Sequence, residues 1–194
     1  MNDPDFIDLE QCRRGDPRVL ASLHRVFGDR VFRICLGVLG QHADAEDAAQ
    51  EVLLRILEGA GSFAGRSRFS TWVFRLTVNH CLNRRKQRRL GLTKLPEEDS
   101  DEPISSARSP LQEAAAAEER VELHAALARL RPRHRVALVL RELEGLSYRE
   151  MAEVLQVPVG TVMSRLARAR QELLRRLPGL LAERTETVGD RHAL

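Results

Sequence analysis

Residues Leu143–Arg170 read LEGLSYREMAEVLQVPVGTVMSRLARAR, and this segment is the most informative about the fold. Ser147 and Glu150 have the spacing of a capping box, in which the two side chains bond free backbone N–H groups at a helix start. The pattern predicts a short helix over Tyr148–Leu155, a three-residue turn, and a longer helix that begins at Gly160. Two helices joined by so tight a turn are typical of a helix-turn-helix, whose second helix can enter the DNA major groove.

The second helix of this motif carries side chains suited to reading bases. Thr161, Ser164, Arg165 and Arg168 lie on or near one face, away from the apolar side. Arginine can bind guanine through two hydrogen bonds, and hydroxyl groups can bond bases or phosphates. The segment 159–181 carries a net charge of +4, which favours contact with DNA. The alternative is a helical hairpin whose arginines only face the solvent.

Charge is distributed unevenly along the chain, although its formal net charge is only +3 over 194 residues. Residues 59–94 contain nine basic side chains and no acidic one, whereas residues 95–119 contain eight acidic side chains and one basic. Two basic blocks separated by an acidic segment indicate two contacts with polyanions. For one block alone, a solvated surface is the alternative.

The composition favours helices, because Leu, Ala, Arg and Glu are abundant and aromatic residues make up only 4%. Apolar spacings of three and four predict helices from Pro17, over Asp44–Glu58 and from Ser70 into the arginine cluster. Further helices are predicted over Leu111–Leu130 and Pro132–Leu143. Residues 92–110 have few large apolar side chains and are expected to be a flexible linker. We therefore expect an all-α protein with a helical domain over 1–91, an acidic linker over 92–110, a helix-turn-helix domain over 111–181 and a tail over 182–194.

The first basic block offers a second surface for nucleic acid. Arg75, Asn79, Asn83 and Lys86 follow one another at intervals of four, four and three, so one helical face presents them together. Arg84 belongs to the arginine cluster that extends this surface.

The loop 61–68, just before that helix, combines two glycines with Phe63, Arg66 and Ser67. Such a loop can hold an unstacked base against a ring and backbone amides, as single-strand binders do. Core packing is the alternative for Phe63, and it is the interpretation that we favour for Trp72.

The helix predicted over Asp44–Glu58 opens with a dense acidic cluster, DAEDAAQE. Acidic side chains in a first turn interact favourably with the helix dipole, which is a sufficient structural explanation. The same density, with Gln50 beside it, could equally form a docking surface for a basic partner.

No motif in the chain indicates catalysis, a cofactor or a metal. Cys12, Cys35 and Cys81 are widely spaced, without a C-x-x-C pair, so we expect reduced and mostly buried thiols. His80 lies next to Cys81 on a helix, and the two cannot face one metal without further ligands. No run of about 18 apolar residues predicts membrane insertion, and the acidic start is unlike a signal peptide.

Three segments together resemble an extracytoplasmic-function (ECF) sigma factor: Asp44–Arg55 (DAEDAAQEVLLR), Phe69–Leu82 (FSTWVFRLTVNHCL) and Leu143–Arg170. The resemblance covers roughly residues 5–178. It implies a bacterial transcription initiation factor, not an enzyme by itself, that binds core RNA polymerase, directs it to promoters and helps to melt them.

The resemblance also implies which residues meet which partner. Core RNA polymerase would contact Asp44, Asp47, Gln50 and Glu51. Residues 1–91 correspond to sigma region two, which takes the minus-ten element of promoter DNA as a melted strand. Its expected contacts are Phe63, Arg66, Ser67, Arg75, Asn79, Asn83, Arg84 and Lys86. The helix-turn-helix domain corresponds to region four, which reads the minus-thirty-five element as duplex, through Thr161, Ser164, Arg165 and Arg168.

The resemblance further implies an anti-sigma factor that holds the two domains inactive. It implies a cytoplasmic location in a bacterium. If the anti-sigma factor is held at the membrane, the chain would be kept close to the membrane too. Two other classes remain open from the residues alone. One is a conventional transcription regulator whose N-terminal helices dimerise or bind a ligand, and the other is a helical interaction module sequestered by a partner. A regulator needs neither the acidic helix nor the basic block 59–94, and these two features discriminate the classes.

Overall fold

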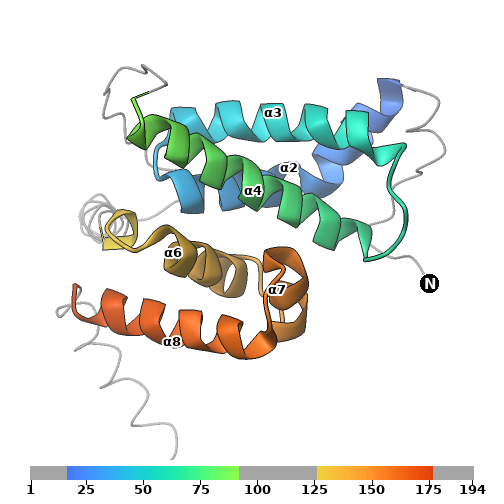
Figure 1. Ribbon diagram of the computed structural model, residues 1–194. Coiled ribbons are helices and arrows are strands. Elements are labelled where there is room, and N and C mark those ends of the chain that lie inside the picture. The colour runs from blue at the N-terminus through green and yellow to red at the C-terminus, as the bar shows by residue number, and fades with distance from the viewer. Residues whose placement is uncertain (1–16, 92–125, 177–194) are drawn as a thin grey trace, which may run out of the picture.

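The computed structural model describes residues 17–91 and 126–176 (Figure 1). Residues 17–91 form the N-terminal bundle, which consists of α2 (Pro17–Leu39), α3 (His42–Ala60) and α4 (Phe69–Arg89). Residues 126–176 form the C-terminal bundle, which consists of α6 (Pro132–Leu138), the π-helix η1 (Val139–Leu143), α7 (Tyr148–Leu155) and α8 (Val159–Leu174). The predicted all-α fold is confirmed in these residues, which contain no strand.

The core of the N-terminal bundle lies where α2 packs on both α3 and α4. The buried stripe of α2 has the spacing of three and four that the sequence shows, and it includes Leu23, Phe27, Val31 and Ile34. Phe27 meets Phe74 of α4 edge-on, with ring centroids 6.5 Å apart. One apolar face of α2 thus holds the other two helices in place.

The C-terminal bundle is built around α8, on which α6 and α7 pack. The helix predicted over Pro132–Leu143 is present, but from Val139 onward its backbone widens into the π-helix η1. The N–H of Glu144 closes this wider turn by donating to the carbonyl of Val139 at 3.3 Å. A π-turn shifts the side chains that follow it relative to a regular helix.

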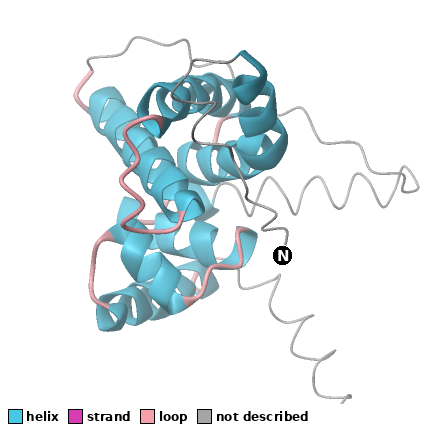
Figure 2. Cartoon of the chain, turned by 90° about the vertical axis from the view of Figure 1, so that its right-hand side faces the viewer, coloured by secondary structure: helices cyan, strands magenta, loops and turns pink. Residues whose placement is uncertain are grey.

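The two bundles are in contact and share one hydrophobic core. α2 touches α6 and η1, and α4 touches α7, so the C-terminal bundle lies along the N-terminal one in both views (Figures 1 and 2). The sequence predicts two domains but not this contact.

Several predicted segments lie outside the described residues. They are the linker 92–110, the tail 182–194 and most of the helix predicted over Leu111–Leu130, of which residues 126–128 are seen as helix. The predicted domain boundaries therefore stay predictions. Within the two bundles, no helix combines the length and the apolar character that crossing a membrane requires.

Candidate nucleic-acid interface

The predicted helix-turn-helix is present as α7, a short turn and α8. The hydroxyl of Ser147 accepts from the N–H of Glu150 at 3.3 Å, and the Glu150 carboxylate accepts from the N–H of Ser147 at 2.8 Å. Hydrogen bonds from Ser147 hold the pKa of Glu150 below its ordinary value. Gln156 then takes a left-handed conformation, with φ of 52°, which ends α7 and redirects the chain into α8.

One side of α8 is fixed in the core by Val162, Leu166 and Ala169. A different face of the helix presents the four predicted base-reading residues at spacings of three and four, and these are Thr161, Ser164, Arg165 and Arg168. Within the described residues, neither arginine has an ion-pair partner.

Arg170, on the same helix, differs from these two arginines because it forms an ion pair. Its guanidinium lies 2.8 Å from the carboxylate of Glu142, which also raises the pKa of Arg170. The positive charge of α8 is therefore divided between a pair inside the bundle and a face left for another molecule.

Four of the predicted minus-ten residues lie together on the surface of α4. Asn79, Asn83 and Lys86 are exposed and Arg75 is half-buried, and their spacing places all four on one face. Arg84 is not part of this row, because it lies half a turn away and faces α3.

Phe63 belongs to a small aromatic cluster beside this row. Its ring lies 5.3 Å from that of Phe69 and 5.7 Å from that of Trp72, measured between centroids. Phe63 and Trp72 are only half-buried, so they cover the edge of the core and also face the solvent. In the same loop Arg66 is exposed and Ser67 is half-buried.

The acidic helix divides into a buried and an exposed part. Asp44 is buried and forms an ion pair with Arg88 of α4. Asp47 and Glu51 are exposed, and Arg84 lies 3.4 and 3.3 Å from their carboxylates. Gln50 is exposed as well. The structure thus brings three of the four predicted polymerase-binding residues to one surface and takes Asp44 out of it.

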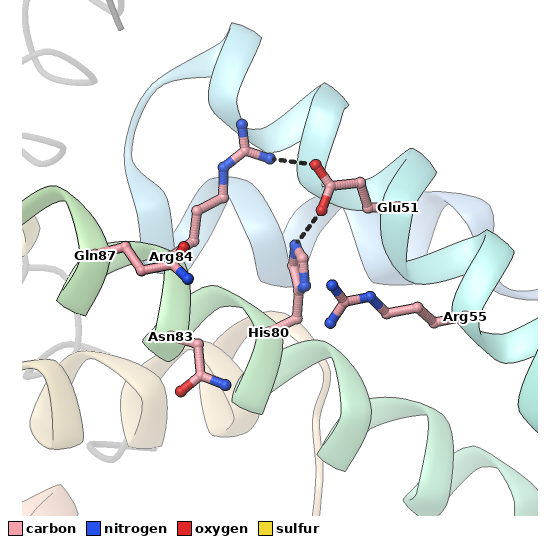
Figure 3. A pocket seen from close by; sticks show the side chains of 6 residues that line it. All are labelled: Glu51, Arg55, His80, Asn83, Arg84 and Gln87. Atoms are coloured by element: carbon pink, nitrogen blue, oxygen red, sulfur yellow. Dashed lines mark hydrogen bonds and ion pairs between the residues drawn. The ribbon is translucent and has the colours of Figure 1, made fainter. Parts of the chain in front are cut away.

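A polar cavity of about 350 Å³ lies between α3 and α4 (Figure 3). It is lined by Glu51, Arg55, His80, Asn83, Arg84 and Gln87. Burial, assisted by the nearby charge of Arg55, lowers the pKa of His80, so its imidazole is neutral at pH 7. The Nε2 atom of His80 lies 3.4 Å from a carboxylate oxygen of Glu51. The cavity connects the acidic surface of α3 with the exposed row on α4.

The cysteines that the structure describes are buried, as the sequence predicts. Cys35 of α2 and Cys81 of α4 are free thiols with their sulfur atoms 3.5 Å apart. The Cys81 thiol and burial raise the pKa of Cys35 far above its ordinary range, which keeps it protonated. In residues 17–91 and 126–176 no three His, Cys, Asp or Glu side chains gather into a metal site.

Two buried charges, Arg135 and Glu144, carry no motif or periodic signal in the sequence. Their partners lie about 100 residues away on α2. The only trace of them in the sequence is a pair of glycines near the end of an apolar helix, Gly37 and Gly40.

Both bundles resemble regions of known proteins. The family models of sigma-70 region 2 and sigma-70 region 4 match residues 23–90 and 120–173. The RNA polymerase sigma-H factor of Pseudomonas aeruginosa is 32% identical over 182 residues, which cover 90% of this chain and 94% of that protein. The ECF RNA polymerase sigma factor SigM of Mycobacterium tuberculosis is 32% identical over 163 residues, 84% of this chain and 79% of that protein.

A solved structure has the same fold. The structure of CnrH in complex with the cytosolic domain of CnrY matches with a TM-score of 0.65 at 23% identity, over 91% of this chain and 98% of that one.

The helical bundles and the exposed α8 face define a DNA-binding protein of the helix-turn-helix class. The chain belongs to the ECF family of RNA polymerase sigma factors. It is a promoter-specific transcription initiation factor, which works with core RNA polymerase and promoter DNA. A conventional regulator would not match sigma regions in both halves.

Proposed function

We propose that the C-terminal bundle reads the minus-thirty-five duplex through the outer face of α8. The observation that carries this assignment is which arginines of α8 are already bound in an ion pair. Arg165 and Arg168 have no ion-pair partner in the described residues, whereas Arg170 is bound to Glu142. An arginine without a protein partner can form the bidentate contact with guanine that duplex readout uses. Thr161 and Ser164 add hydroxyl groups on the same face.

The N-terminal bundle captures the minus-ten strand along α4 and its preceding loop. Asn79 and Asn83 offer amide groups to unpaired bases, and Arg75 and Lys86 neutralise phosphates beside them. The half-exposed ring of Phe63 can stack a flipped base, and Arg66 and Ser67 of the same loop can hold its backbone. Capture of flipped bases would drive melting, because it stabilises the open strand.

The exposed acids of α3 dock on core RNA polymerase. This assignment uses Asp47, Gln50 and Glu51, which share one exposed surface. Asp44 and Arg84 receive other roles than the sequence predicts. Asp44 links α3 to α4 through its ion pair with Arg88. Arg84 of α4 forms ion pairs with the carboxylates of Asp47 and Glu51 and so orients them.

An anti-sigma factor is a further expected partner. Two solved structures with the same fold are complexes of two proteins, and one of them is the sigma factor RpoE with the anti-sigma factor NepR from Bartonella quintana. That structure matches with a TM-score of 0.64 at 23% identity, over 82% of this chain and 96% of that one. The chain would act in the bacterial cytoplasm, and close to the membrane where such a partner is anchored.

Reconstituted transcription tests these assignments. The purified chain is added to sigma-free core polymerase with a library of promoter fragments, and transcripts and co-elution with core are measured. Alanine at both Asp47 and Glu51 should abolish co-elution, and alanine at Asn79 should preserve co-elution but reduce transcription. Arg170→Ala serves as the control with a lost charge outside every proposed surface. If the unaltered chain neither co-elutes with core nor supports any transcript, the assignments fail.

A further inference from the structure

The end of α2 is shaped to receive the C-terminal bundle. A Cβ atom at Gly37 would lie 2.7 Å from a methyl group of Val139, closer than real Cβ contacts come. Valine is stiff about its single side-chain torsion, so it cannot move aside cheaply. The absence of a side chain at Gly37 is what lets η1 approach α2.

Arg135 inserts its guanidinium into the same place. Its side chain is 1% exposed, and its Nε donates to the carbonyl of Gly37. The last carbonyls of a helix lack partners within the helix, and cations are favourable there. Gly40 leaves room for this group, because a Cβ there would lie 2.8 Å from Nη2 of Arg135. Arg85 of α4 fills the neighbouring position by donating to the carbonyl of Val38 at 3.0 Å.

Glu144 supplies the opposite charge across the same interface. Its side chain is 1% exposed, and it lies 3.0 Å from Arg30 and 3.1 Å from Arg33 of α2. The turn formed by η1 brings Glu144 to this position. Both of these arginines belong to the other bundle, so separation of the bundles would return this carboxylate to water.

The buried charges make this interface specific, but they contribute little net free energy to it. Among the described residues Nη2 of Arg135 has no hydrogen-bond partner, and a buried donor without a partner costs free energy. Two buried ions must also be desolvated each time the bundles meet, which offsets much of their attraction. Such a contact defines one arrangement of the bundles and yet can be opened.

In the closed arrangement the protein is too compact to reach both promoter elements at once. The two elements lie about 25 base pairs apart, which is roughly 85 Å at 3.4 Å per base pair. A compact body of the described size has a radius of gyration of about 14 Å, and hence a diameter of about 40 Å. Fully extended, the 34 residues between Gly91 and Ala126 would reach at most about 120 Å. The covalent chain therefore permits the separation that the closed form does not provide.

We propose that Gly37, Arg135 and Glu144 form a latch that holds the chain closed without any partner, and that the latch opens before both promoter elements can be occupied together. The second clause rests on the proposed function, whereas the first does not. In the closed form Ser164 and Arg168 of α8 are exposed and Thr161 and Arg165 are half-buried, and the acidic surface of α3 is exposed as well. The latch thus blocks the simultaneous use of the two DNA surfaces and leaves each one accessible by itself.

Small-angle X-ray scattering of the purified full chain tests the latch. Gly37→Ala should open the chain by its clash with Val139, and it should not weaken α2, because alanine is the better helix former. Glu144→Gln should open it by removing the buried carboxylate charge that Arg30 and Arg33 share across the interface. We expect a larger radius of gyration in both variants, from a shift of about tenfold or more toward the open form.

Two matched controls separate the latch from general damage. Gly28→Ala makes the same change on α2, where the new Cβ would meet only His24 of its own helix at 3.3 Å. Glu142→Gln removes a carboxylate from η1 that pairs with Arg170 inside the C-terminal bundle. Both should scatter like the unaltered chain, and circular dichroism should show unchanged helix content in all four variants.

The latch is refuted if the unaltered chain is already as extended as Gly37→Ala, or if Gly37→Ala and Glu144→Gln stay as compact as their controls. No polymerase or DNA enters this experiment, so its failure is distinct from failure of the proposed function. In reconstituted transcription, the opened variants should reach half-maximal activity at a lower concentration of the chain than their controls.

Discussion

At the scale of single residues, the basic side chains of α4 differ in what they are bound to. Arg84 and Arg88 form ion pairs with carboxylates of α3, and Arg85 caps α2. Lys86, in the middle of the same run, is exposed on the face that carries Asn79 and Asn83. A run of like charges can therefore contain both structural and binding residues, and the direction of each side chain separates them.

Arg168→Ala should weaken duplex binding by about 1–3 kcal/mol, and the loss should depend on the base at one position. The reason is that a bidentate contact discriminates guanine from other bases. Titrations against duplexes that vary each position in turn measure this loss. Arg170→Ala is the control, since its guanidinium is paired with Glu142. An equal loss on every duplex would instead assign Arg168 to a phosphate.

At the scale of elements, α7 depends on its first turn more than on its length. Eight residues are too few for a stable isolated helix. The capping box at Ser147 and the burial of Met151 and Val154 hold it in place. This short helix packs on α8, so loss of its capping box would also weaken the support of the helix that is proposed to bind DNA.

Ser147→Ala should lower the free energy of unfolding by about 1 kcal/mol at neutral pH through loss of the cap. Because the folded-state pKa of Glu150 lies below its ordinary 4.5, its contribution is present above that pH and is lost as pH falls through the folded value. The difference between variant and unaltered chain should thus shrink in acid. Urea titrations at neutral and acidic pH measure it. Ser164→Ala, on an exposed face of α8, should change stability little, and a pH-independent loss for Ser147→Ala would contradict the prediction.

The loop and α4 should act as one element in strand capture. Phe63→Ala and Asn79→Ala should impair promoter melting, because each removes a contact to an unpaired base. Both should leave duplex binding by α8 unchanged. Permanganate footprinting reports melting, and a duplex with only the minus-thirty-five element reports the second activity. If both activities fall together, the proposed division between the bundles is wrong.

At the scale of the whole molecule, the shared core makes the two bundles one cooperative body. Each bundle also contains one natural reporter, because the chain has a single Trp and a single Tyr. Trp72 lies in the N-terminal bundle and Tyr148 in the C-terminal one, where Arg141 stacks 5.1 Å from its ring.

Thermal unfolding of the full chain should therefore give coincident transitions for Trp72 fluorescence and Tyr148 absorbance. The physical reason is that melting of one bundle exposes the apolar face that it shares with the other. In Gly37→Ala, which opens the interface, the two transitions should separate. Separate transitions in the unaltered chain would show that the contact between the bundles contributes little to their stability.

Much of the fold could be predicted because its signals are local. The helix-turn-helix follows from the capping box and the apolar spacing within Leu143–Arg170, and the helices of the N-terminal bundle follow from the same periodicity. The side chains of Thr161, Ser164, Arg165 and Arg168 lie away from the core, because burial of Val162 and Leu166 dictates which side of α8 faces inward. The π-turn at Val139 was not predictable, because it serves a contact with α2 rather than a local preference.

The helices, the helix-turn-helix and the separation of charge into two basic blocks follow from local sequence, because each depends on neighbours within one or two turns. Tertiary packing commits some charges to the protein, such as Asp44 with Arg88, and leaves others for other molecules. It also decided that the bundles meet at Gly37, Arg135 and Glu144. Ion pairs of this kind join residues about 100 positions apart, and a linear pattern contains no information on which distant carboxylate an arginine will find.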